Sequence, residues 1–110
     1  GCYRKFGSSE QEKNLLIKAA TSLESAGSEL LILELVNSST SKQITEVLKI
    51  PTVGIGSGKF VDGQVLVLYD ILGIGKTLSF AKNFLSESNS IEECVKNYIQ
   101  AVKEGTFPEN

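Results

Sequence analysis

The chain begins with a stretch in which apolar residues recur at the spacing of a helix. The apolar positions that share this face are Leu15, Leu16, Ala19, Ala20, Leu23 and Ala26. Ser9 stands three residues before Glu12, which is the arrangement of a capping box, and Gly27 is typical of the residue that ends a helix. The pattern therefore predicts a helix over residues 10–26.

Apolar runs in the middle of the chain predict the strands of a parallel sheet. Residues 30–35 are almost continuously apolar, a pattern typical of a strand that is buried on both faces. A short helix is expected over residues 41–49, where Pro51 stops it, and a second strand over residues 52–56. Residues 65–69 fit either a third strand or a buried helical turn, because the period of a short apolar run does not separate the two.

The last third of the chain has helical spacing again. We expect helices over residues 79–87 and 91–104, and the second begins with a capping box at Ser90 and Glu93. Alternating helices and strands indicate an α/β fold with parallel strands. Because two or three strands make only a small sheet, residues 1–110 are expected to form a single partial domain of a larger α/β fold.

Composition excludes several classes of protein. Apolar residues make up 41% and charged residues 22% of the chain, as in an ordinary globular protein. The net charge of −2 leaves no basic stripe, so we expect no nucleic-acid partner. No apolar run approaches the roughly 18 residues of a membrane span, and no secretory leader opens the chain, so a cytoplasmic location without membrane contact is expected. The chain contains no methionine and begins at Gly1, which we interpret as processing, trimming or a fragment.

Residues that commonly bind metals are scarce. The chain has no histidine, and Cys2 and Cys94 are too far apart in sequence to form a CxxC pair. We therefore expect two reduced thiols and no metal site within this chain.

Two glycine-rich segments raise the alternative of nucleotide binding. A phosphate-binding loop of the form GxxxxGK[ST] would need glycine where the first segment has Val53, and serine or threonine where it has Phe60. The second segment ends in Gly75-Lys76-Thr77 but has Asp70 in place of the first glycine, and a carboxylate there would repel phosphate. We therefore set the nucleotide interpretation aside.

Glu34 is the strongest candidate for chemistry. It interrupts an apolar strand near its carboxyl end, where parallel α/β folds bind their ligands. Partial desolvation at that position would raise the pKa of the carboxyl group towards the range useful for a general base. The alternative is a structural glutamate that pairs with a lysine or caps the following helix, and position alone does not separate the two. Among the glycines near the strand ends, Gly56 and Gly58 would allow close approach of a ligand to the backbone.

Five sequence blocks resemble the C-terminal part of the ketopantoate hydroxymethyltransferase family. They are LILE at 31–34, IPTVGIGSG at 50–58, DGQVLVLYD at 62–70, LG at 72–73 and FAKNF at 80–84. The resemblance covers almost the whole chain. It implies the C-terminal portion of a (β/α)8 TIM barrel of the phosphoenolpyruvate/pyruvate superfamily, followed by C-terminal helices. Tyr69 departs from the histidine common in the family, and the segment 75–79 is shorter than its counterpart.

The resemblance also implies an activity. The family transfers a hydroxymethyl group from 5,10-methylenetetrahydrofolate to 3-methyl-2-oxobutanoate, which gives 2-dehydropantoate for pantothenate and coenzyme A synthesis. Glu34 stands at the motif position of the base, while Gly56 and Gly58 are candidates for binding substrate. Mg²⁺ ligands are expected in an N-terminal half that has no counterpart here, and the expected partners are that half or other subunits of a homo-oligomer. The alternative is a non-catalytic remnant or interaction module that lacks the metal site.

Overall fold

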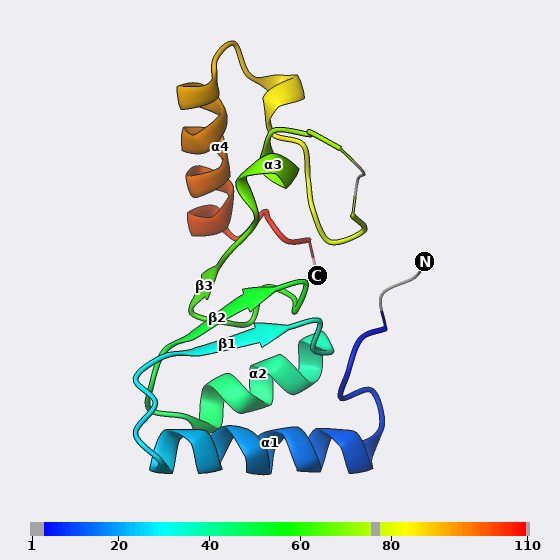
Figure 1. Cartoon of the computed structure of the whole chain (residues 1–110), viewed down its shortest axis with the longest axis vertical. Coiled ribbons are helices and arrows are strands. Elements are labelled where there is room, and N and C mark those ends of the chain that lie inside the picture. The colour runs from blue at the N-terminus through cyan, green and yellow to red at the C-terminus, as the bar shows by residue number, and fades with distance from the viewer. Residues whose placement is uncertain (1–3, 76–77, 110) are drawn as a thin grey trace. The chain divides into compact units, whose positions relative to one another are not determined.

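The computed structural model describes residues 4–75 and 78–109 (Figure 1). The chain divides into two compact units, residues 1–64 and 65–110. The first unit contains α1 (Glu10–Ser25), β1 (Leu31–Glu34), α2 (Ser38–Val47), β2 (Thr52–Ile55) and β3 (Gly63–Gln64). The second unit contains α3 (Leu68–Ile71), the 3-10 helix η1 (Leu85–Glu87) and α4 (Ile91–Glu104).

Side-chain caps set the starts of the two helices in the first unit. The Ser9 hydroxyl accepts a hydrogen bond from the Glu12 amide, as the capping box predicts, and α1 ends one residue earlier than expected. Helix α2 begins at Ser38 rather than at residue 41, because the Asn37 side chain accepts a hydrogen bond from the Ser39 amide. The polar residues before 41 therefore belong to the helix.

The three strands of the first unit form a parallel sheet in the order β1-β2-β3. Leu31 pairs with Thr52, and Glu34 pairs with Ile55. On the other edge of β1, Phe6 forms a parallel bridge with Val36. The segment at Phe6 and the strands β1, β2 and β3 therefore all run parallel to their neighbours. Helix α1 connects the first two of them, and α2 connects β1 with β2.

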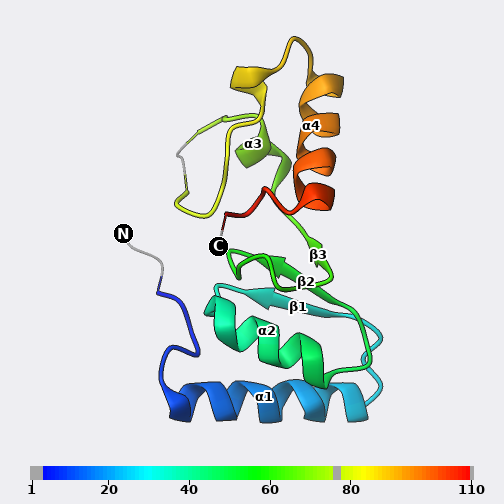
Figure 2. The ribbon, with the colours of Figure 1, turned by 180° about the vertical axis from the view of Figure 1, so that it is seen from behind.

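Helices α1 and α2 lie on the same side of β1 and β2 (Figures 1 and 2). Leu33 packs there in a core that also contains Ala20, Val36, Ile44 and Leu48. On the opposite face Ile32 is 59% exposed and Glu34 is exposed as well. The prediction that strand 30–35 is buried on both faces is therefore wrong for this chain, because its helices cover only one face.

A hydrogen-bonded network fixes the start of β2. The Thr52 amide donates to Asp62 Oδ2 at 2.8 Å, and the Thr52 hydroxyl lies 3.3 Å from the same oxygen. Thr52 is completely buried, and its hydroxyl also lies 2.8 Å from that of Thr45. The network joins α2, β2 and the segment before β3 at the amino end of the sheet.

Replacing Asp62 with alanine is expected to lower the free energy of unfolding by about 1–3 kcal/mol, because the buried Thr52 amide loses a charged acceptor. Urea unfolding followed by circular dichroism measures the loss. Glu46→Ala is the matched control, since Glu46 is exposed on α2 and its side chain makes no hydrogen bond or ion pair within the described residues. Equal midpoints for the two variants would show that the Asp62 bond contributes nothing measurable.

Two segments of the second unit differ in part from the sequence prediction: of the two alternatives for residues 65–69, the structure has the helical turn, as α3, and not the strand. Residues 65–69 do not form a strand, because the pairing with β2 ends at Gln64 and α3 begins at Leu68. The helix expected over 79–87 is reduced to η1. The Asn83 side chain accepts hydrogen bonds from the amides of Leu85 and Ser86, and the Phe84 amide donates to Ile71 rather than to the preceding turn.

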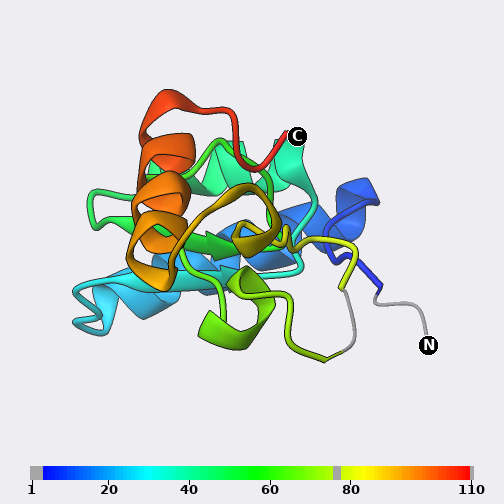
Figure 3. The same cartoon turned by 90° about the horizontal axis from the view of Figure 1, so that it is seen from above.

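Helix α4 has the bounds that the sequence predicts. The Ser90 hydroxyl accepts from the Glu93 amide, and Gly105 ends the helix at a φ of 74°. The chain turns after α4 (Figure 3), and Phe107 completes an aromatic cluster. The ring centroids of Phe84 and Tyr98, and those of Phe84 and Phe107, are 5.5 Å apart with edge-to-face geometry. No helix among the described residues is long and apolar enough to cross a bilayer.

The Cys94 thiol is expected to resist alkylation in the native protein. Its side chain is fully buried and its sulfur faces the Ile71 carbonyl oxygen, while burial raises the pKa of the thiol. Labelling with iodoacetamide and peptide mass spectrometry should show that Cys94 reacts at least about a hundredfold faster in urea than in buffer. Equal rates would mean that this part of the second unit is open in solution. Cys2 lies outside the described residues.

Candidate functional site

Glu34 lies at the carboxyl end of β1, on the sheet face that α1 and α2 leave uncovered. Its register partner on β2 is Ile55, so the segment that follows β2 starts beside it. Glu34 is exposed in this chain. The expected partial desolvation is therefore not found here, because nothing in the first unit covers that face.

The Glu34 carboxylate makes no hydrogen bond or ion pair within the described part of the chain. Asn37, and not Glu34, caps the following helix. The alternative role for Glu34, a structural glutamate that pairs with a lysine or caps the following helix, is therefore not found among the described residues. An unpaired carboxylate at a strand end is available to accept a proton from a bound molecule.

The backbone changes direction directly after Glu34. Leu35 has a φ of 54°, a conformation that costs a residue with a side chain about 1 kcal/mol or more. Three hydrogen bonds secure the segment. The Leu35 amide donates to the Ile55 carbonyl at 3.0 Å, and the carbonyl of Leu35 and the amide of Asn37 both bond to Phe6 at 2.7 Å.

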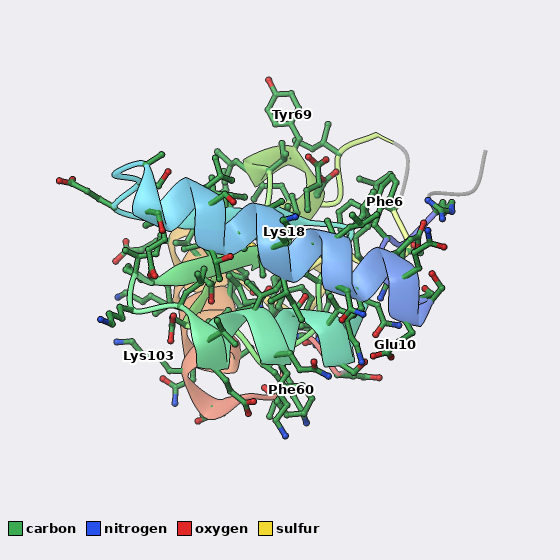
Figure 4. The ribbon with its side chains drawn as sticks, turned by 90° about the horizontal axis from the view of Figure 1, so that it is seen from below. Phe6, Glu10, Lys18, Phe60, Tyr69 and Lys103 are labelled. Atoms are coloured by element: carbon green, nitrogen blue, oxygen red, sulfur yellow. The ribbon has the colours of Figure 1, made fainter. Side chains whose placement is uncertain are left out.

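The segment before α1 is fixed beside this strand end. Glu12 accepts from the Gly7 amide at 3.2 Å and pairs with Arg4, whose guanidinium holds the pKa of that carboxyl group below its usual value. The buried Thr40 hydroxyl donates to the Gly7 carbonyl at 2.7 Å. Figure 4 shows Phe6 beside the amino-terminal end of α1. The strand end that carries Glu34 is therefore held from its outer edge as well.

Sequence reasoning missed Ser57 as part of the site. Its side chain is completely buried, donates to the Leu33 carbonyl at 2.7 Å and accepts from the Val36 amide at 3.0 Å. One hydroxyl thus bonds to the backbone on both sides of Glu34. A serine between two glycines after a strand is the signal that could have indicated this contact.

Gly56 and Gly58 form the turn that follows β2, and the structure brings this turn next to the end of β1. Their φ values are 63° and 82°, in the region that favours glycine. The Gln64 side-chain amide donates to the Gly58 carbonyl at 2.8 Å. The two sequence-predicted glycines therefore lie on a braced turn beside the strand end that carries Glu34.

The arrangement does not match a phosphate-binding loop. Residues 59–62 contain no helix and lead into β3, whereas a phosphate loop continues into a helix. In the second segment Asp70 belongs to α3, and Lys76 and Thr77 lie outside the described residues.

The ring of Tyr69, 63% exposed, projects from α3 (Figure 4). Across residues 4–75 and 78–109 no group of three or more acidic or thiol side chains gathers as a metal site would require.

Comparison with known proteins gives a consistent result. The family model described as "Ketopantoate hydroxymethyltransferase" matches residues 1–110. Proteins named 3-methyl-2-oxobutanoate hydroxymethyltransferase are 51% identical in Buchnera aphidicola and 49% identical in Nitrosospira multiformis. A protein from Hahella chejuensis, named 3-methyl-2-oxobutanoate hydroxymethyltransferase 2, is 46% identical. Each alignment includes 98% of this chain and 42% of the relative, so the chain spans less than half the length of these relatives.

Proposed function

Because the chain belongs to the ketopantoate hydroxymethyltransferase family, we propose that it carries the general base of a hydroxymethyl transfer. The acceptor is 3-methyl-2-oxobutanoate, the donor is 5,10-methylenetetrahydrofolate, and the product is 2-dehydropantoate. The relatives are enzymes by name, and those names contain the name of the acceptor. The donor and the role of each residue are part of the proposal.

The position of Glu34 is the observation that carries this proposal. A general base needs a carboxylate that is free of internal partners and lies where ligands bind. Glu34 meets both conditions, since it is unpaired among the described residues and stands at the carboxyl end of a parallel strand. The braced turn of Gly56 and Gly58 beside it offers backbone contacts for a substrate.

The proposed chemistry begins with removal of a proton from the acceptor. Glu34 takes the proton from the carbon beside the keto group, and the electron pair of that C–H bond becomes the enolate. The enolate carbon then forms a bond to the one-carbon unit of the folate. Water hydrolyses the two C–N bonds that hold this unit, which gives tetrahydrofolate with both nitrogens protonated and a carbonyl carbon at the level of formaldehyde. The new C–C bond forms to that carbon while the C=O π electrons move to its oxygen, which takes up a proton and becomes the hydroxyl group.

Mg²⁺ would polarise the keto acid and stabilise negative charge on its oxygens. The described residues do not fit the ion, because they gather no set of three acidic ligands. We therefore place the magnesium ligands outside this chain and derive no step through the metal.

We further propose that the chain forms the carboxyl-terminal portion of a TIM barrel. Parallel strands with helices on one face only are the arrangement of a barrel wall. The uncovered face, with Ile32, Val53 and Ile55, would then face the barrel interior. The partners of this chain would be the remaining residues of the barrel or other subunits of a homo-oligomer in the cytoplasm.

A transfer assay of the complete enzyme tests the proposal. Formation of 2-dehydropantoate should require the keto acid, methylenetetrahydrofolate and Mg²⁺ together. Absence of turnover, combined with ligand-free self-association in sedimentation experiments, would instead support a non-catalytic interaction module. A rise in the stability of the protein on addition of ATP would instead support nucleotide binding.

A further inference from the structure

We propose that Gln64 is a positioning residue that holds the turn of residues 56–59 as a seat for one carboxylate group of a substrate. The inference rests on the proposed function, because it assigns a role to a residue beside the same site. Gln64 does not contact the reacting atoms. It acts through the backbone of the turn.

The contact between Gln64 and the turn is specific. Gln64 lies at the end of β3 and is half-buried, and its Nε2 donates to the Gly58 carbonyl oxygen at 2.8 Å. Gly58 is buried and has a φ of 82°. A buried carbonyl that loses its donor is costly, so the bond restrains the turn in one conformation. Ser57 restrains the other side of the turn through the end of β1.

The turn carries hydrogen-bond donors that the protein does not use. Within the part of the chain that the structure describes, the four backbone amides of residues 56–59 donate to no protein acceptor. Successive unpaired amides in a turn with left-handed residues are a common way to bind anionic oxygens. Lys59, at the end of this run, is exposed and adds a positive charge.

The ligand chemistry that suits these donors is a carboxylate. Both proposed substrates carry one: the keto acid beside its carbonyl group, and the folate on its glutamate tail. Phe60 follows the turn, with its ring exposed (Figure 4) and with Lys42 Nζ 5.3 Å from the ring centre. The unused donors therefore favour a carboxylate, and the experiment below distinguishes the carboxylate of the keto acid from that of the folate.

Steady-state kinetics of the complete enzyme test the inference with Gln64→Leu, which keeps the bulk of the side chain but has no donor. The KM for one of the two substrates should rise about five- to tenfold while kcat stays within about twofold of wild type. A rise for 3-methyl-2-oxobutanoate assigns the seat to the keto acid, and a rise for methylenetetrahydrofolate assigns it to the folate. Gln64→Asn, whose amide is one methylene too short to reach Gly58, should show the same change.

Gln43→Leu is the matched control. Gln43 is half-buried on α2 and its side chain makes no hydrogen bond within the described residues, so the same substitution there should leave both KM values unchanged. Unchanged KM values in Gln64→Leu and Gln64→Asn, or a fall in kcat alone, would overturn the positioning role. If those variants behave as wild type while Glu34→Gln is inactive, only this inference fails. If the wild-type enzyme performs no transfer, the proposed function fails and this inference fails with it.

Discussion

The Glu34→Gln variant of the complete enzyme is expected to lose about a thousandfold in kcat for hydroxymethyl transfer. Glutamine keeps the size of the side chain and its hydrogen-bonding reach, but it cannot take a proton. A positioned general base contributes on the order of 10²–10⁴-fold to rate. Because Glu34 has no partner among the described residues, removal of its charge should leave the fold and the KM for the keto acid nearly unchanged.

The control for this substitution lies in the same part of the chain. Glu29→Gln changes an exposed carboxylate shortly before β1, on the amino side of the strand that ends in Glu34. Product formation in a coupled assay should match wild type for Glu29→Gln and should be nearly lost for Glu34→Gln. Comparable kcat values for the two variants would show that another residue removes the proton.

The second large effect is expected at Gly73 in the second unit. A Cβ atom added there would lie 2.2 Å from Asn83 Nδ2 and 2.4 Å from Asn83 Cγ. Asn83 cannot move away freely, because its side-chain oxygen accepts hydrogen bonds from Leu85 and Ser86 at the start of η1. Gly73 also has a φ of 70°, which disfavours alanine in its own right. Gly73→Ala should lower the free energy of unfolding by about 3 kcal/mol.

Gly75 separates the two contributions. Its φ is 87°, but an added Cβ would meet no atom within 4 Å. Gly75→Ala should therefore show only the backbone cost of about 1 kcal/mol. Urea unfolding followed by circular dichroism compares the variants. Equal losses would mean that the contact between Gly73 and Asn83 does not constrain the native state.

Much of the fold was predictable because its signals are local. The capping boxes at Ser9 and Ser90 lie at the starts of α1 and α4, and Gly105 ends α4 as a left-handed residue. The segment after Leu72 was not predictable from its period. There the Asn83 side chain takes the place of helical hydrogen bonds, and the Phe84 amide bonds to Ile71, thirteen positions earlier.

The burial of β1 depends on parts of the protein that a local pattern does not specify. A continuous apolar run suggests cover on both faces, yet α1 and α2 cover only the face that contains Leu33. The other face, with the exposed Ile32, is the one we assign to a barrel interior. The sequence pattern indicated apolar side chains on both faces of β1. It did not indicate that the helices of this chain cover only one of those faces.

For the site, sequence reasoning identified Glu34, Gly56 and Gly58, and the structure brings these residues to neighbouring strand ends. Their roles remain proposals. Ser57 was missed because its hydroxyl bonds to Leu33 on the neighbouring strand, and Gln64 because its side chain bonds back to Gly58 in the turn six positions earlier. The position of Ser57 between two glycines after a strand is a weak signal of its contact, and the Gln64 contact has no comparable signal in the local sequence.

Proton exchange at the keto acid tests the central claim most directly. The complete enzyme with Mg²⁺ is incubated with 3-methyl-2-oxobutanoate in D₂O without folate, and the loss of the proton beside the keto group is followed by NMR. We expect exchange with wild type and with Glu29→Gln, and no exchange above background with Glu34→Gln, while the keto acid still binds to that variant. Exchange at the wild-type rate in Glu34→Gln would contradict the assignment of Glu34 as the general base.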